Sequence, residues 1–162
     1  MAESVRPLEY SKRPYRPCVG IVLINRQKQI FVGQRLDNSV EAWQMPQGGI
    51  DDGETPIDAG FREMREEIGT NKAEMIAEHS AWLDYDIPLE LANRLWQGRF
   101  KGQTQKWIAF RFLGDDHDIN IATEEPEFRE WKWAEPSILP SLAVPFKRDV
   151  YQNILSEFAP LF

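Results

Sequence analysis

Three glutamates lie close together in a segment whose pattern is typical of a helix. Glu63, Glu66 and Glu67 are three and four residues apart, so a helix would bring their carboxylates to one face. Like charges at these spacings destabilise an isolated helix, and the negative end of the helix dipole adds to that cost. A bound hard cation would remove the cost, and Mg²⁺ takes one or two protein carboxylates together with phosphate oxygens. The spacing is therefore that of a candidate magnesium site.

The simpler interpretation of these residues is a charged helix face in contact with water. Arg62 and Arg65 lie among the glutamates and would offset part of their charge. For an acidic helix chosen at random, we would favour this interpretation over a metal site. The residues that surround the helix decide between the two interpretations.

The helix that carries the glutamates is predicted over residues 56–68. Thr55 provides an N-cap, Pro56 opens the first turn, Asp58 occupies the capping-box position and Gly69 ends the helix. One face of the helix is apolar and is expected to pack in the core: Ile57, Phe61, Met64 and Ile68. The carboxylates then lie on a second face, away from this apolar stripe.

The spacing of the residues around this helix resembles the Nudix box, a signature of hydrolases that act on nucleoside diphosphates linked to another moiety. Seven fixed positions match in order: Gly48, Glu54, Arg62, Glu63, Glu66, Glu67 and Gly69. At ordinary residue frequencies of roughly 5–7% each, a chance match at a given start is about one in 10⁸. Met64 occupies the first apolar position, but Thr70 stands where the pattern ends on an apolar residue.

The resemblance implies a role for each of these positions. The three glutamates of the helix match metal-binding carboxylates, and the backbone carbonyl of Gly48 is a further ligand. Glu54 pairs with Arg62 and fixes the glycine-rich turn on the helix. Two or three Mg²⁺ ions, for which Mn²⁺ can substitute, would activate a water that attacks a phosphorus of the polyphosphate chain.

Further short motifs extend the resemblance from about residue 14 to about residue 158. They are similar to those of bacterial RNA pyrophosphohydrolases, which are also described as dinucleoside polyphosphate hydrolases. The motifs occur in this order: Tyr15-Arg16-Pro17, residues 43–49 (WQMPQGG), Gln105-Lys106-Trp107, Pro126-Glu127-Phe128 and residues 146–151 (FKRDVY). Each motif is weak by itself, but their order and number indicate the subfamily.

The subfamily resemblance implies further contacts to metal and substrate. Glu127 is an additional acidic group that reaches the metals, and the general base is either Glu127 or a box glutamate that metal does not fully occupy. Arg16 and Phe146 hold a base between guanidinium and ring, a contact worth about 1–3 kcal/mol. The remaining candidates contact phosphates or the first nucleotides: Arg35, Gln47, Tyr85, Lys106 and Lys147.

Structural alternatives stay open for three of these residues. Phe146 could instead be a core residue at the start of a helix, and Arg16 could be an exposed charge at a strand edge. Tyr85 lies in residues 84–104, a long segment that is predicted to be a loop. The six tryptophans are expected in the core, since tryptophan is found there more often than as a ligand platform.

The remaining elements predict an α+β fold, a Nudix-like α/β/α sandwich around a mixed sheet. Strands are predicted at the following residues: 19–25, 30–35, 43–45, 75–83, 106–113 and 128–133. The first two form a hairpin, residues 46–50 form a glycine-rich turn, and residues 146–158 form an amphipathic helix. Residues 1–13 are predicted to be a flexible segment, and residues 14–162 a single Nudix hydrolase domain.

Charge and composition exclude some classes of protein. The net charge of −7 over 162 residues argues against a protein that coats nucleic acid through bulk electrostatics. Residues 1–36 are nevertheless basic, with seven Lys or Arg and two Glu, which suits a small anionic ligand that is bound locally. The single cysteine, Cys18, and the lack of a secretory signal or a membrane-length apolar run predict a cytoplasmic protein with no membrane span.

These features together predict a magnesium-dependent pyrophosphohydrolase. The expected substrate is the 5′ end of triphosphorylated or diphosphorylated RNA, which is trimmed to a 5′-monophosphate. Diadenosine tetraphosphate and other dinucleoside polyphosphates are the alternative substrates, since they present a base, a ribose and a polyphosphate to the same groove. An inactive Nudix module that binds nucleotides is the alternative from another class, and the intact glutamates argue against it.

Overall fold

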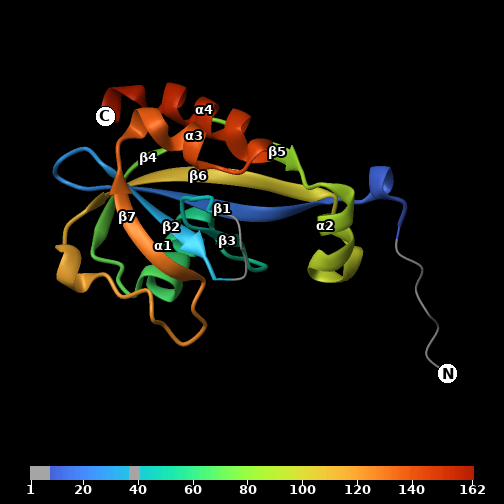
Figure 1. Ribbon diagram of the computed structural model, residues 1–162, viewed down its shortest axis with the longest axis horizontal. Helices are drawn as coiled ribbons and strands as arrows, with labels where there is room; N and C mark the ends of the chain where they lie inside the picture. Colours follow the sequence, from blue (N-terminus) through green and yellow to red (C-terminus); the bar gives the residue numbers. More distant parts are fainter. Residues whose placement is uncertain (1–7, 37–40) are drawn as a thin grey trace.

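The computed structural model describes residues 8–36 and 41–162, in which helices lie on both faces of one mixed sheet (Figure 1). The strands are β1 (Tyr15–Ile24), β2 (Ile30–Arg35), β3 (Gln47–Gly49), β4 (Ala73–Glu78), β5 (Leu83–Asp86), β6 (Gly102–Phe112) and β7 (Phe128–Ala134). The α-helices are α1 (Pro56–Ile68), α2 (Leu89–Arg94), α3 (Leu139–Leu142) and α4 (Arg148–Glu157). The 3₁₀ turns are η1 (Tyr10–Lys12), η2 (Leu95–Gly98), η3 (Asp116–Asp118), η4 (Pro136–Ile138), η5 (Pro145–Lys147) and η6 (Ala159–Leu161).

The sheet follows the order β4-β6-β1-β2-β7, with β3 paired to β1 and β5 paired to β6. β1 and β6 are parallel over their shared length, while the other strand pairs are antiparallel. At the hairpin, Ile24 of β1 pairs with Ile30 of β2. Nearer its start, β1 pairs with β3. The predicted α+β arrangement with a mixed sheet is confirmed.

Helix α1 covers one face of the sheet with the bounds that the sequence predicts (Figure 1). The Thr55 hydroxyl accepts a hydrogen bond from the backbone N–H of Asp58 at 3.2 Å, and Gly69 ends the helix at a φ of 80°. Met64 and Ile68 are fully buried, and each stabilises the fold by about 1.5–3 kcal/mol. The acidic residues of α1 are thereby held in one orientation relative to the sheet.

Helix α4 covers the opposite face together with α3 (Figure 1). Its buried residues include Tyr151 and Ile154. The Tyr151 hydroxyl accepts a hydrogen bond from the backbone N–H of Met45 at 2.9 Å, so α4 also fixes the segment that leads into β3. The helix predicted over residues 146–158 is a 3₁₀ turn, η5, followed by α4.

The strand predicted at residues 43–45 is wrong. Gln44 forms an isolated bridge to Gly33, and the strand that pairs with β1 is β3, inside the expected glycine-rich turn. Gly48 and Gly49 have no side chains, so their backbone pairs with β1 while other side chains pack directly on them. Residues 46–55, which run through β3 to the start of α1, are called the glycine loop below.

The loop predicted at residues 84–104 is also wrong, because it contains β5, α2, η2 and the start of β6. β5 pairs with the first residues of β6, so the strand predicted at residues 75–83 is split into β4 and β5. The sequence does not reveal this pairing because residues 102–105 (GQTQ) lack apolar alternation. Residues 87–101, called the α2 lobe, project beyond the sandwich beside the start of β1 (Figure 1).

Residues 8–13, part of the segment predicted to be flexible, contact the α2 lobe. The Tyr10 hydroxyl donates a hydrogen bond to a backbone carbonyl of the lobe at 2.6 Å, and the buried Arg13 donates from Nη2 to Asn93 Oδ1 at 2.7 Å. Residues 1–7 of that segment lie outside the described residues. None of the helices that the structure describes has both the length and the apolar composition of a membrane span.

Candidate active site

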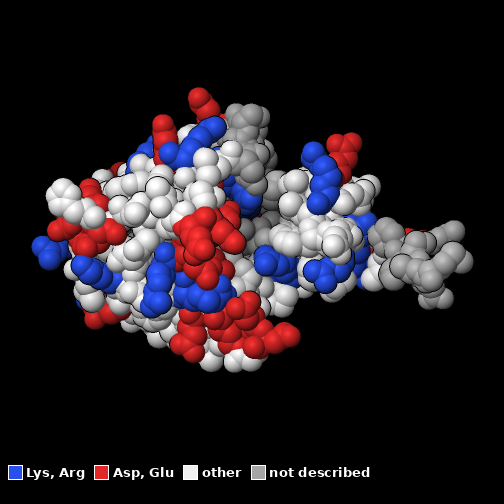
Figure 2. Space-filling view, turned by 90° about the horizontal axis from the view of Figure 1, so that it is seen from below, with Lys and Arg blue, Asp and Glu red and all other residues white. Residues whose placement is uncertain are grey.

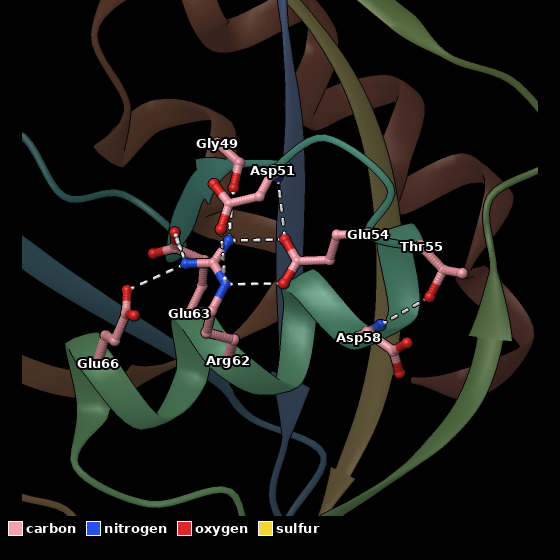
Figure 3. Close-up of polar contacts among 8 residues, drawn as sticks. All are labelled: Gly49, Asp51, Glu54, Thr55, Asp58, Arg62, Glu63 and Glu66. Atoms are coloured by element: carbon pink, nitrogen blue, oxygen red, sulfur yellow. Dashed lines mark hydrogen bonds and ion pairs between the residues drawn. The ribbon is translucent and has the colours of Figure 1, made fainter.

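Arg62 on α1 is the centre of a hydrogen-bond network that joins this helix to the glycine loop (Figure 3). Its Nε and Nη2 donate to the two carboxylate oxygens of Glu54, each at 2.8 Å, and Nη2 also donates to the Gly49 carbonyl oxygen at 2.8 Å. This bidentate ion pair is stronger than an ordinary hydrogen bond, and it lowers the pKa of Glu54 to about 2. The expected Glu54–Arg62 pair is confirmed, and it seats the loop on the helix.

Two of the three box glutamates contact the same guanidinium (Figure 3). Arg62 Nη1 donates to Glu63 Oε1 at 2.9 Å and to Glu66 Oε2 at 3.2 Å. The Glu63 side chain is 12% exposed and lies against Gly48, where a Cβ would overlap its carboxylate, whereas the Glu66 side chain is 56% exposed. Burial raises the pKa of Glu63 to about 7, although Arg62 acts in the opposite direction.

Glu67 is the most buried of the three, with 6% of the residue exposed. Its Oε2 atom has no hydrogen-bond partner among the described residues. Burial first, and then the charges of Glu63 and Glu127, raise the pKa of Glu67 well above its ordinary value, although Arg35 opposes the shift. A buried, unpaired carboxylate oxygen costs free energy until a proton or a cation meets it.

Glu127, the candidate from outside the box, is exposed and directly precedes β7. Its backbone carbonyl accepts a hydrogen bond from the N–H of Leu36 at 2.9 Å, which ties this residue to the end of β2. The charge of Glu127 contributes to the raised pKa values of Glu63 and Glu67, so its carboxylate lies near theirs. The structure therefore brings the four predicted acidic residues into one region.

The donor chemistry of this region fits a hard divalent cation. Mg²⁺ prefers carboxylate and backbone carbonyl oxygens, Glu67 offers an unpaired oxygen, and the Glu63 carboxylate lies directly against Gly48. Among the described residues, no three acidic, histidine or cysteine side chains are already gathered as a cation site. Because Arg62 holds Glu63 and Glu66, these two carboxylates would rotate from the guanidinium toward a cation.

Gln47 of the glycine loop joins a buried polar network with β5 and β6. Gln105 Nε2 donates to Gln47 Oε1 at 2.9 Å and to Gln103 Oε1 at 2.8 Å, and Gln47 Nε2 donates to Gln103 Oε1 at 3.2 Å. The Tyr85 hydroxyl accepts longer hydrogen bonds from Gln47 and Gln105, at 3.5 and 3.4 Å. The network fixes two of the predicted substrate-binding residues, Gln47 and Tyr85, in one arrangement.

Trp107 of β6 holds Gln105 of this network in place. Its indole Nε1 donates a hydrogen bond to Gln105 Oε1 at 2.9 Å, and the tryptophan is almost fully buried. The indole ring lies directly on Gly20 of β1, where a Cβ would overlap it. The glycine is thus required for the ring to reach its position.

Phe146 and Lys147 lie in η5, next to this network. The Phe146 ring centroid is 5.8 Å from that of Tyr85. Lys147 is buried and donates to Gln44 Oε1 at 3.4 Å, and burial together with the charge of Arg35 lowers its pKa to about 8. An aromatic face and a poorly paired cation therefore adjoin each other, as binding of a base and a phosphate would require.

Arg16, which was expected to face Phe146 across a base, contacts Trp96. Its guanidinium carbon lies 4.9 Å from the centroid of the Trp96 ring. The guanidinium also lies against Gly49, where a Cβ would overlap it. Arg16 thus connects the glycine loop to the α2 lobe.

A comparison with known families decides what this arrangement is. Residues 14–154 match the NUDIX domain family, a range that includes the glycine loop, α1 and the glutamine network. The chain belongs to the Nudix family. Nudix hydrolases generally use divalent metals such as Mg²⁺, which agrees with the oxygen donors gathered around α1.

Several curated Nudix relatives are similar to this chain over nearly their whole length. The chain is 58% identical to an RNA pyrophosphohydrolase of Rhodospirillum rubrum, over 94% of this chain and 92% of the relative. It is 54% identical to an RNA pyrophosphohydrolase of Roseobacter denitrificans, over 94% and 96% of the two chains. A relative of the same name from Rickettsia typhi is 51% identical over 94% and 95%.

Solved Nudix structures share the fold at low sequence identity. The E. coli dihydroneopterin triphosphate pyrophosphohydrolase is 19% identical, with a TM-score of 0.65 over 87% of this chain and 97% of that chain. A C. elegans Ap4A hydrolase binary complex is 17% identical, with a TM-score of 0.61 over 90% and 99%. The predicted Nudix-like sandwich is confirmed by these structures.

Lys106, a predicted substrate contact, has its Nζ 4.0 Å from a carboxylate oxygen of Glu78, so its role in the site stays a prediction.

The Nudix box locates the carboxylates, but other features of the site were not predicted. The glutamine network was missed because its strand is polar. The contact between Arg16 and Trp96 was also missed, although residues 94–106 contain four Lys or Arg and no acidic residue, a signal that sequence reasoning could have used.

Proposed function

We propose that this Nudix protein is a divalent-cation-dependent pyrophosphohydrolase that trims the 5′ end of triphosphorylated or diphosphorylated RNA to a 5′-monophosphate. The observation that carries the proposal is the buried Glu67 carboxylate, whose unpaired oxygen lies in the same region as Glu63 and Glu127 beside the glycine loop. The relatives named RNA pyrophosphohydrolase, at up to 58% identity, support the substrate class.

The metal would be held by the Gly48 carbonyl and by four carboxylates: Glu63, Glu66, Glu67 and Glu127. Bound Mg²⁺, or Mn²⁺ in its place, supplies an activated water and neutralises charge on the phosphates. The protein contributes the geometry. Arg62 holds the glycine loop on α1, so that the backbone at Gly48 keeps its position relative to the helix that carries three of the carboxylates.

The substrate would extend from the carboxylates along the glutamine network. Lys147 and Arg35 supply positive charge for the phosphates, and an arriving phosphate would restore the lowered pKa of Lys147 toward its ordinary value. The half-buried Phe146 offers a ring face for the first base, and the buried Tyr85 lies next to it, in the glutamine network with Gln47. Arg16 and Lys106 remain candidates for contacts farther along the substrate.

Dinucleoside polyphosphates are the second candidate substrate, and one observation favours them. Two aromatic side chains are candidates for stacking a base: Phe146, beside Tyr85, and Trp96, beside Arg16. A molecule with a base at each end of its polyphosphate could use both.

Turnover measured side by side on three substrates tests the proposed function. With Mg²⁺ present, we expect triphosphorylated and diphosphorylated RNA to give a 5′-monophosphate with a higher kcat/KM than diadenosine tetraphosphate gives. A higher value for diadenosine tetraphosphate would favour the second candidate. Binding of RNA with no release of phosphate or pyrophosphate would identify an inactive binding module and overturn the proposal.

Divalent cations are expected to stabilise the metal-free protein. A cation at about 100 times its Kd adds roughly 2.7 kcal/mol, because it binds the folded state and not the unfolded one. For a domain of this size the melting temperature should then rise by about 5–10 °C with Mg²⁺ or Mn²⁺. Differential scanning fluorimetry before and after treatment with EDTA measures this shift.

EDTA should also abolish hydrolysis, and added Mg²⁺ should restore it. Ca²⁺ at the same concentration separates a specific site from a general salt effect. Full activity in the chelator, or a melting temperature that millimolar Mg²⁺ and Mn²⁺ leave unchanged, would contradict a metal site at these carboxylates.

Phe146→Ala is expected to weaken RNA substrates chiefly through KM. Loss of one stacking contact costs about 1–3 kcal/mol, or roughly 5- to 150-fold in kcat/KM. Phe146 is half-buried and packs against the core, so the same change should also lower the melting temperature. Steady-state kinetics and a thermal melt together separate the two effects.

Phe146→Leu is the matched control, since leucine keeps most of the packing and removes the ring face. It should regain most of the lost stability and keep the raised KM. A leucine variant with the KM of the wild type would mean that Phe146 serves packing alone.

A further inference from the structure

Two basic segments lie side by side at the starts of β1 and β6, although the protein carries a net charge of −7. Residues 12–16 (KRPYR) contain three Lys or Arg, residues 94–106 contain four, and neither segment contains Asp or Glu. The parallel pairing places Tyr15 opposite Gly102 and Arg16 opposite Gln103, so the segments are neighbours. Figure 2 shows Lys and Arg side chains across the part of the surface that holds the α2 lobe.

Several of these cations are not neutralised by acidic partners. In the described part of the chain, no carboxylate forms an ion pair with Arg16, Arg94, Arg99 or Lys101. Lys12 pairs with Glu9 at 3.7 Å, Lys106 lies 4.0 Å from Glu78, and Arg13 is buried. The unpaired cations make this surface attractive to an anionic chain.

Aromatic rings alternate with the cations on this surface. The guanidinium carbon of Arg16 lies 4.9 Å from the centroid of the Trp96 ring, and that of Arg99 lies 5.6 Å from the centroid of the Phe100 ring. The Trp96 and Phe100 rings are 5.8 Å apart and nearly perpendicular. Both aromatic residues are half-buried, and alternating cations and ring faces are what proteins use to bind single-stranded nucleic acid.

The backbone at Trp96 is held in a conformation that bulky residues seldom adopt. Trp96 and Gln97 have φ values of 48° and 59°, in the left-handed region, and neither is a glycine. Conformations of this kind persist where the surrounding structure fixes them, and they are frequent at ligand-binding sites. Here the left-handed turn places the indole against Arg16.

This surface is directly connected to the candidate active site. The Arg16 guanidinium contacts Gly49, and the Gly49 carbonyl accepts a hydrogen bond from Arg62 at 2.8 Å. One side chain, Arg16, therefore lies between the glycine loop and Trp96. A chain whose 5′ phosphates lie at the carboxylates has the α2 lobe within reach of its later nucleotides.

We propose that Arg16, Trp96, Arg99 and Phe100 form a platform for single-stranded RNA downstream of the 5′-terminal nucleotide. A base stacks on Trp96, and the cations of the lobe contact the backbone phosphates. This inference rests on the proposed function and extends it, because the protein then binds the RNA chain as well as its phosphorylated end.

Trp96→Ala, measured on triphosphorylated RNAs of one to six nucleotides, tests the platform. For RNAs long enough to reach Trp96, we expect the substitution to raise KM at least about 5-fold more than it does for the shortest substrates. Trp96→Phe keeps a ring face and should restore most of the affinity. Trp82→Ala is the matched control, since Trp82 is 46% exposed in the turn between β4 and β5.

A second measurement separates binding from catalysis. Fluorescence anisotropy with a 5′-monophosphorylated hexanucleotide in EDTA should show weaker binding for Trp96→Ala and for the double variant Arg99→Gln/Lys101→Gln. The double variant should also have a shallower slope in a plot of the logarithm of the binding constant against the logarithm of the salt concentration. The slope should decrease in magnitude by about 0.7 per lost phosphate contact. It serves as the test if Trp96→Ala does not fold.

The outcomes distinguish the platform from the proposed function. A KM increase that is equal at all lengths, with unchanged anisotropy for both variants, would overturn the platform and leave the function intact. A wild-type protein that hydrolyses no RNA of any length would overturn both.

Discussion

Glu67→Gln should reduce turnover by at least about 100-fold while making the metal-free protein more stable at neutral pH. Glutamine has the size of glutamate but cannot supply the anionic oxygen that a hard cation prefers. Loss of a metal ligand costs several kcal/mol of transition-state stabilisation, on the order of 10²-fold or more in rate. Single-turnover kinetics at saturating Mg²⁺ measures this loss.

The gain in stability follows from the buried charge. Burial raises the pKa of Glu67 above its ordinary value of about 4.5, so the folded metal-free protein holds a proton that the unfolded chain gives up. The free energy of unfolding of the wild type therefore falls as the pH rises above about 4.5 toward the raised pKa. The variant lacks the contribution of Glu67 to this dependence, so at pH 7 in EDTA its melting temperature should be higher than that of the wild type. Below about pH 4 the difference should disappear.

Glu66→Gln and Glu74→Gln complete this comparison. Glu66 is largely exposed, so its substitution should lower turnover as a ligand loss but change the melting temperature little. Glu74 is exposed on β4 and pairs with Arg111 of β6, outside the group of carboxylates that would hold the metal, and its substitution should change neither quantity. Near wild-type turnover of Glu67→Gln would remove Glu67 from the set of catalytic ligands.

Arg62→Ala is expected to impair both folding and turnover. The substitution removes two 2.8 Å bonds to Glu54 and the bond to the Gly49 carbonyl, and it leaves the mostly buried Glu54 carboxylate without its cation. Removing one partner of such a pair costs about 2–4 kcal/mol, which corresponds to a melting temperature lower by roughly 10 °C. The glycine loop is then no longer held on α1, so turnover should fall by on the order of 10²-fold or more.

Arg62→Lys separates the charge of this residue from its geometry. Lysine keeps the positive charge but cannot bond both Glu54 oxygens and Gly49 from one planar group. We expect part of the stability to return, with turnover still well below that of the wild type. If the lysine variant had full turnover, Arg62 would act through its charge alone, and the proposed seating of the loop would be wrong.

Helix α1 and its carboxylates could be predicted from the sequence because the signals are local. Thr55, Pro56 and Gly69 fix the ends of the helix, and the period of its apolar residues fixes the buried face. The Glu54–Arg62 pair followed from the Nudix resemblance, since its two members lie eight residues apart in a fixed motif. The burial of Glu67 could not be read from the helix alone, because it depends on how the glycine loop and the end of β2 cover it.

The features that could not be predicted depend on contacts between distant segments. β5 was missed because its partner in β6 is polar, and the glutamines there are buried only because Gln47 and Tyr85 arrive from elsewhere in the chain. β3 lies in residues whose composition is typical of a turn. The contact of Arg16 with Trp96, eighty residues away, depends on the pairing of β1 with β6, while the base that Arg16 and Phe146 were predicted to hold between them stays a prediction.

The seating of Trp107 on Gly20 restricts how this site could diverge during evolution. The indole bonds Gln105, which in turn bonds Gln47, a residue proposed to bind substrate, so each residue depends on the next. A substitution at one position would leave a buried polar group without its partner, or a ring without its space. New substrate preferences at Gln47 would therefore require coordinated replacements, and the four positions should covary as a unit.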